Sequence, residues 1–126
     1  QYGRAVERFR KASELNPKEA SPRFHLAQAY VALGKYREAA EQIREGLVLR
    51  PAWTDSRFAP RSLYGAKEKS YDNHLVGLER VVAEFPNNND LNLVLAYQYW
   101  FDGRKADAHR LFEKLPRESV IAFQKK

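Results

Sequence analysis

The chain has 126 residues, of which 44% are hydrophobic and 30% charged, and its formal net charge at pH 7 is +6. This composition is that of one folded domain rather than a disordered chain. It contains no cysteine, which excludes disulfides and thiolate metal sites, and no stretch as long as the roughly 20 apolar residues of a membrane span. Because methionine is also absent, we expect a piece of a longer or processed protein, whose localisation stays open between cytoplasm and export.

The first predicted element is a helix over residues 2–15, which ends before Pro17. Its apolar residues recur at spacings of three and four, which is typical of one buried helix face. The same stripe returns after 34 residues before Pro51, again before Pro86, and a fourth time near the C-terminus. The four stripes are Ala5, Phe9 and Ala12; Ala39, Ile43, Gly46 and Leu47; His74, Leu78, Val81 and Val82; and Ala108, Phe112 and Leu115.

Partner helices are predicted between these repeated helices. Ser21 followed by Pro22 has the form of an N-cap with proline at the first helical position, and Asp55 and Asp90 recur at the equivalent place. Two partner helices also share an L-A-x-x-Y pattern, formed by Leu26, Ala27 and Tyr30 and by Leu95, Ala96 and Tyr99. The sequence therefore predicts a series of helix pairs.

Residues 25–51, HLAQAYVALGKYREAAEQIREGLVLRP, resemble a tetratricopeptide repeat (TPR) of bacterial type. The resemblance implies an all-α, right-handed superhelical solenoid of antiparallel helix pairs over a single domain, residues 1–126. Within it, residues 1–17 are the second helix of a truncated repeat, 20–51 a repeat, 54–86 a divergent repeat, 89–115 a repeat and 117–124 a short capping helix. Val120, Ile121 and Phe123 of that last helix are expected to cover the end of the array.

The third repeat departs from the family pattern in its first helix. Pro60 lies inside the expected helix, where it costs about 3 kcal/mol, and Arg61 replaces the small residue that close packing favours. Gly65 is typical of a helix end or turn. We therefore predict a short or broken helix here, accompanied by a cleft. His74, which replaces the alanine of the sister helices, either bonds Tyr64 or a backbone carbonyl, or lines that cleft with Tyr64.

The resemblance implies a non-catalytic module that binds a protein or peptide in a concave groove lined by the first helix of each repeat. The Lys/Asn clamp of chaperone-binding members is missing, since Phe24 and Gln28 occupy its places. Trp100 and Phe101 either bind the partner or pack the end of the array. Carried over to this sequence, the groove residues are Phe24, His25, Gln28, Val31, Phe58, Asp90, Val94, Tyr97, Trp100 and Phe101.

Two other partner classes stay open, and neither enzymatic nor cofactor chemistry is expected. Phe9 and Leu15 on the first helix are expected to be half-uncovered, so self-association through this face is one alternative. RNA binding is the weaker one, because charges of both signs alternate along the helices and the mapped groove contains no Lys or Arg. No catalytic motif or metal-ligand spacing accompanies the histidines. Nothing in this segment predicts membrane contact.

Overall fold

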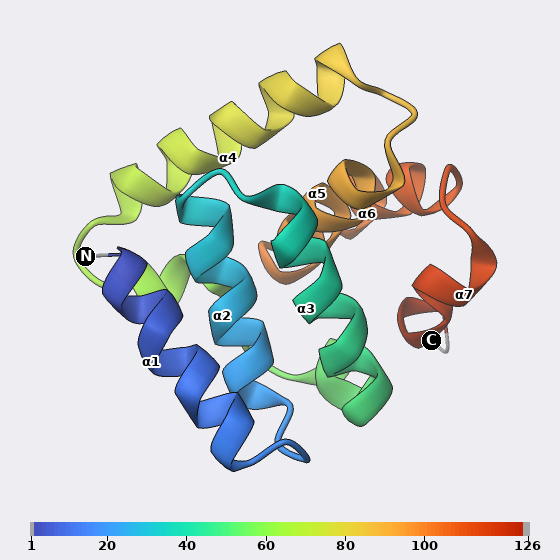
Figure 1. Cartoon of the computed structure of the whole chain (residues 1–126). Helices are drawn as coiled ribbons and strands as arrows, with labels where there is room; N and C mark the ends of the chain where they lie inside the picture. The colour runs from blue at the N-terminus through green and yellow to red at the C-terminus, as the bar shows by residue number, and fades with distance from the viewer. Residues whose placement is uncertain (1, 125–126) are drawn as a thin grey trace. The chain divides into compact units, whose positions relative to one another are not determined.

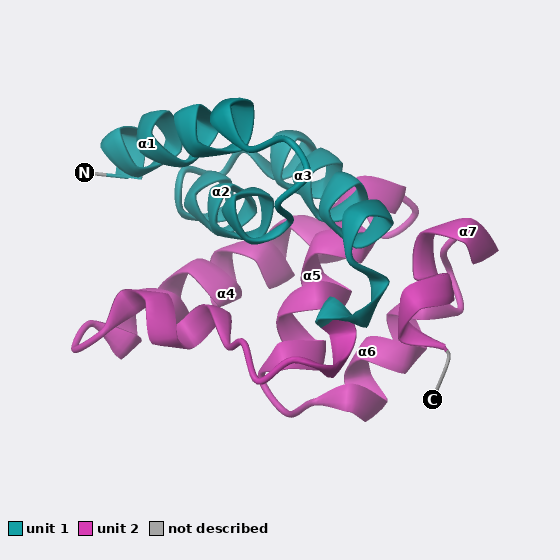
Figure 2. Ribbon diagram, turned by 90° about the horizontal axis from the view of Figure 1, so that it is seen from below, with its two compact units in different colours: residues 1–53 teal, residues 54–126 magenta. Residues whose placement is uncertain are grey.

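The computed structural model describes residues 2–124, which form α-helices and short 3-10 helices without any β-strand (Figure 1). The all-α class predicted from the sequence is therefore confirmed. The contacts between Cα atoms divide the chain into two compact units, residues 1–53 and 54–126 (Figure 2). Within the described residues, every helix is too short or too polar to cross a membrane.

Unit 1 contains three consecutive helices, α1 (Tyr2–Leu15), α2 (Ser21–Ala32) and α3 (Tyr36–Leu49). Neighbouring helices run in opposite directions, and α2 packs against both α1 and α3 (Figure 1). The turn between α2 and α3 needs a left-handed residue, which Gly34 supplies with a φ of 73°.

The core of unit 1 depends on a close approach between α2 and α3. Phe24 on α2 is fully buried, and its ring stacks on Trp53 with 4.4 Å between the centroids. The far end of the ring lies against Gly46 of α3, where a Cβ atom would come within 2.6 Å of the Phe24 Cζ. A second cluster joins α1 to α2 through Val6, Leu26 and Ala29.

Unit 2 begins in the middle of η1 (Pro51–Asp55) and continues with η2 (Pro60–Tyr64), α4 (Glu68–Glu84), α5 (Asn89–Phe101) and α6 (Lys105–Phe112). It ends with α7 (Arg117–Val120) and η3 (Ile121–Phe123). α5 is the central helix of this unit, packs against α4 and α6, and is buried at all of residues 91–100.

The predicted break in the third repeat is confirmed. Two 3-10 turns, η1 and η2, replace the expected first helix, and residues 57–59 between them are not helical. η2 starts at Pro60, whose ring fits the first position of a helix, and stops at Gly65, which has a φ of 57°.

Two details of the helix ends differ from the sequence analysis. Asn88, not Asp90, caps α5, because its side-chain Oδ1 accepts the Leu91 N–H at 3.0 Å. Ser21 is the first residue of α2 rather than its N-cap, which is Ala20. At the C-terminus Val120 and Phe123 are buried as expected, whereas Ile121 is 55% exposed. It does not cover the end of the array.

Candidate partner-binding site

The predicted groove residues of α2 lie mostly in the core of unit 1. Phe24, Gln28 and Val31 are buried, so they contribute to packing rather than to an exposed surface. His25 is half-buried, and its Nδ1–H donates to the Ser21 carbonyl at 2.8 Å, while its ring lies 5.1 Å from that of Phe9.

The predicted groove residues of unit 2 divide into buried and half-buried ones. Val94, Tyr97 and Trp100 on α5 are buried, with exposed fractions of 0%, 0% and 4%. Phe58, Asp90 and Phe101 are half-buried. Only this last group presents side-chain surface for a partner without any rearrangement of the helix.

A partly open cavity of about 320 Å³ brings two of these half-buried residues together. Phe58 enters it from the non-helical segment after η1, and Phe101 from the last turn of α5. Their rings meet edge to face with 5.6 Å between the centroids. The lining consists of residues 54–59, Trp100, Phe101, Gly103 and Lys105, all of them in unit 2.

Hydrogen bonds fix the wall of this cavity. Thr54, which is buried, donates from Oγ1 to the Ala122 carbonyl at 2.9 Å. The Thr54 carbonyl in turn accepts the indole N–H of Trp100 at 2.9 Å. The Trp100 ring packs 5.2 Å from the Phe123 ring, so the irregular segment, α5 and η3 hold one another in place. A site on such a pre-organised wall costs little ordering entropy when it binds.

Three charged side chains line the cavity together with the aromatic rings. Arg57 and Lys105 are exposed, and the Lys105 ammonium lies 4.4 Å from the centroid of the Trp100 ring in a cation–π contact. Asp55 supplies one carboxylate. The lining therefore combines an apolar floor with a small excess of positive charge.

Arg61 anchors the segment on the far side of Pro60. Its Nε and Nη2 donate to the two carboxylate oxygens of Asp102 at 3.1 and 3.0 Å, and its Nη1 donates to Asp72 at 2.8 Å. The guanidinium also lies 4.7 Å from the centroid of the buried Tyr71 ring. The hydrogen bonds to Asp102 and Asp72 raise the pKa of Arg61, and burial raises the pKa of Tyr71. One arginine thus joins η2, α4 and the C-terminal end of α5.

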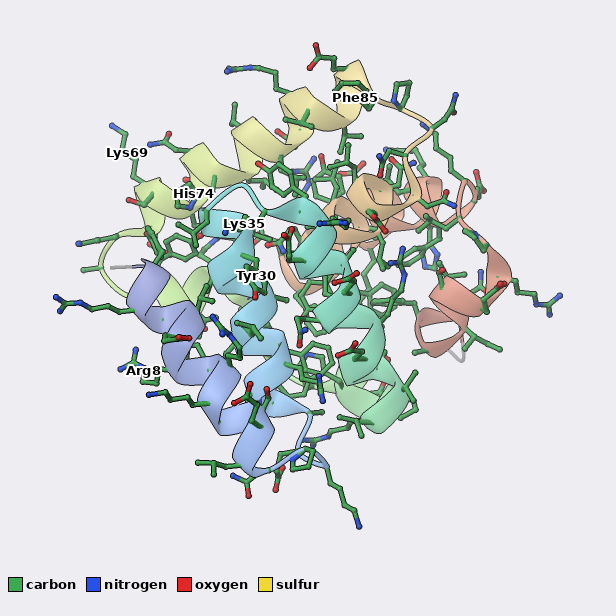
Figure 3. The ribbon with its side chains drawn as sticks, viewed as in Figure 1. Arg8, Tyr30, Lys35, Lys69, His74 and Phe85 are labelled. Atoms are coloured by element: carbon green, nitrogen blue, oxygen red, sulfur yellow. The ribbon has the colours of Figure 1, made fainter. Side chains whose placement is uncertain are left out.

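Tyr64 and His74, the residues of the predicted cleft, form a pair of their own. A hydrogen bond of 2.8 Å joins Tyr64 Oη to His74 Nδ1, which is the first of the two outcomes expected for His74. Burial lowers the pKa of His74, which favours the neutral ring. His74 projects from α4 (Figure 3). Neither residue contributes to the cavity lined by Phe58 and Phe101.

The sequence analysis did not single out Arg57 and Lys105, which line this cavity. Both lie outside the helix positions that line the groove in regular repeats, since Arg57 is in the non-helical segment and Lys105 begins α6. The feature of the sequence that could have indicated them is the break at Pro60, because residues 54–59 before it are not in a regular helix and form one wall of the cavity. The described part of the chain brings no three His, Asp or Glu side chains together at metal-binding distances.

Comparison with known proteins gives a family model that matches part of the chain and several similar solved structures. Residues 1–57 match a family model described as a tetratricopeptide repeat. A crystal structure of the MamA protein is similar, with a TM-score of 0.41 and 17% sequence identity. The match covers 99% of this chain but 66% of the MamA chain. No curated protein sequence matches significantly.

Proposed function

We propose that this chain, whose residues 1–57 match the tetratricopeptide repeat family, is a repeat protein of that kind. We propose further that it binds a peptide or protein segment and takes one apolar side chain of it into the cavity of unit 2. Repeats of this family generally mediate protein–protein interaction and do no chemistry of their own. We place the binding surface at Phe58 and Phe101, with Trp100 as its rigid floor.

The observation that carries the proposal is the pair of half-buried phenylalanines in a formed cavity. Full burial of a valine, leucine or phenylalanine side chain contributes about 1.5–3 kcal/mol, and a partly open cavity supplies a part of this amount. The cavity volume of about 320 Å³ lies at the small end of ligand pockets, which suits a single side chain rather than a whole small molecule. Aromatic anchors of this kind dominate the energetics of many interfaces.

The test is a selection of peptides from a random library displayed on phage, followed by affinity measurements with three proteins. The wild type is compared with Phe58→Ala and with the matched control Phe85→Ala, whose ring is 54% exposed at the end of α4 and outside the cavity (Figure 3). We expect Phe58→Ala to weaken the selected peptides at least about tenfold, which is 1.4 kcal/mol. Phe85→Ala should change their affinity less than about twofold. Equal losses in both variants, with helicity preserved, would refute this site.

Self-association through α1 is a second candidate, supported by the exposure of its apolar residues. Leu15 is 80% exposed, and Phe9 is half-buried beside the cluster of Val6, Leu26 and Ala29. Light scattering should then show a mass that rises with protein concentration and falls back to the monomer in Leu15→Glu. A constant monomer mass over a hundredfold range of concentration removes this candidate.

A further inference from the structure

We infer that the cavity of unit 2 selects acidic segments, in which an apolar side chain lies within a few residues of an aspartate or glutamate. The inference rests on the proposed function and names the chemical class of its partner. Arg57 and Lys105 are the residues that carry it.

The two cations at the cavity are distinguished from their neighbours by having no carboxylate partner among the described residues. Arg61, close by in sequence, is bound to Asp102 and Asp72, and Arg104 forms an ion pair with Asp107. The Lys105 ammonium lies over the face of Trp100, which stabilises the cation without neutralising it. Two exposed cations without a carboxylate partner among the described residues thus line the cavity together with the aromatic rings.

The other polar groups of the lining are compatible with a carboxylate. The Ser56 hydroxyl oxygen accepts the Phe58 N–H at 3.3 Å, so its own proton is available to a ligand. The Thr54 hydroxyl donates its proton to the Ala122 carbonyl and thereby stabilises the cavity wall. Asp55 adds one negative charge, which leaves the lining with an excess of one positive charge. A guanidinium at an exposed site can bind a carboxylate with two parallel hydrogen bonds.

The apolar and the charged contacts lie close enough for one short segment to make both, because all these residues line the same cavity. The phenylalanines then supply affinity, and the cations decide which peptides associate quickly and in which register. A basic segment would meet two like charges at the same place. A polyanion such as RNA fits less well, because two cations beside Asp55 neutralise few phosphates.

The experiment compares two double variants that change the net charge by the same amount. Arg57→Glu with Lys105→Glu reverses the cavity cations, whereas Arg80→Glu with Lys114→Glu reverses two exposed cations outside the cavity. All of these side chains are exposed, so we expect both proteins to fold, which circular dichroism and thermal unfolding would verify. Each is used in a fresh selection from the random peptide library and in titrations of peptides selected on the wild type.

We expect the wild type to select peptides enriched in Asp and Glu beside an apolar residue. The cavity double variant should bind them at least about tenfold more weakly and lose the acidic enrichment, while the matched variant changes affinity less than about threefold at 150 mM salt. An unenriched wild-type pool, or equal losses in both double variants, overturns the inference while the Phe58→Ala result still supports the proposed function. If no peptides are selected at all, both are overturned. The inference is also overturned if RNA binds the wild type more tightly than any acidic peptide does and if this affinity is lost in the cavity double variant.

Discussion

Phe24 and Gly46 show how a single missing methyl group decides the packing of unit 1. The Phe24 ring cannot move away from α3, because it is fully buried and stacked on Trp53 at an interplanar angle of 5°. Gly46 is therefore needed for its small size and not for its backbone freedom, since it lies in the helical part of α3. This close approach also explains why Phe24, expected from the family pattern to line a groove, is a core residue.

Gly46→Ala should destabilise the protein, whereas the same substitution at Gly77 should stabilise it. Alanine is favoured over glycine in a helix by about 1 kcal/mol, and this gain applies at both positions. At Gly46 the new Cβ would lie 2.6 Å from Phe24, and overpacking of this kind costs about 1–3 kcal/mol. At Gly77 in α4 no atom lies within 4 Å of the new Cβ. Urea unfolding should show a net loss of up to about 2 kcal/mol for Gly46→Ala and a gain for Gly77→Ala, and two changes of the same sign would contradict the packing argument.

His74 should make the stability of the protein depend on pH. Burial lowers its pKa in the folded state below the ordinary value near 6.5, so the unfolded chain binds more protons as the pH falls through that range. The stability that neutral His74 contributes is thus complete above about pH 7 and is lost as the pH falls through 6.5 towards the folded pKa.

We expect the free energy of unfolding of the wild type to fall more steeply between pH 7.5 and 5.5 than that of His74→Ala, which carries the residue of the sister helices. Both proteins retain His25 and His109, so the difference between the two slopes isolates His74. Chemical denaturation at a series of pH values measures it. Parallel slopes would show that the protonation of His74 is not coupled to folding.

Among the elements, η2 depends most on one side chain. A 3-10 turn of five residues has little stability of its own, and Arg61 ties this one to Asp102 at the C-terminal end of α5 and to Asp72 on α4. Lysine keeps the charge but cannot form two parallel hydrogen bonds or stack its plane on Tyr71.

Arg61→Lys should therefore lower the free energy of unfolding, measured in urea, by about 1–2 kcal/mol. This is less than the usual contribution of hydrogen bonds to charged groups, because 29% of the Arg61 side chain is exposed. Arg80→Lys, at an exposed arginine of α4 without an ion pair among the described residues, is the control and should stay within about 0.5 kcal/mol. Hydrogen exchange would show whether the loss is concentrated in residues 60–64. Equal stabilities of the two variants would mean that Arg61 is only a surface ion pair.

The helices could be predicted from the sequence, but the site could be predicted only in part. Helix positions follow from apolar stripes that recur at 34 or 35 residues, and the break follows from Pro60, because both are local properties of the chain. The cavity wall formed by residues 54–59 has no periodicity, and its conformation is set by distant partners such as the Ala122 carbonyl. The cap of α5 was expected at Asp90, which was wrong, because three consecutive asparagines, residues 87–89, stand at the start of this helix and only geometry selects Asn88 among them.

For the molecule as a whole, the net charge of +6 favours an anionic partner, and some of the arginines are paired with carboxylates of the chain itself. Arg10 pairs with Glu7, Arg23 with Glu45, and both Arg104 and Arg110 with Asp107. Nucleic-acid affinity requires many unpaired cations along one path, because each neutralised phosphate adds to the release of counterions. The distribution of charge therefore favours a partner that makes a few specific ionic contacts over one that presents a continuous phosphate chain.

We accordingly expect single-stranded RNA of about 20 nucleotides to bind with a Kd of about 100 µM or weaker at 150 mM salt, at the weak end of non-specific binding. The logarithm of the affinity should fall with the logarithm of the salt concentration with a slope no steeper than about −2, which corresponds to the neutralisation of about two or three phosphates. Fluorescence anisotropy at three salt concentrations measures both quantities. The double variant Arg80→Glu, Lys114→Glu is the reference, because it shows how much RNA affinity falls when the net charge is lowered outside the cavity. Micromolar binding with a slope near −5 would mean that unpaired cations from several helices act on one RNA strand, and the chain would then be an RNA-binding repeat.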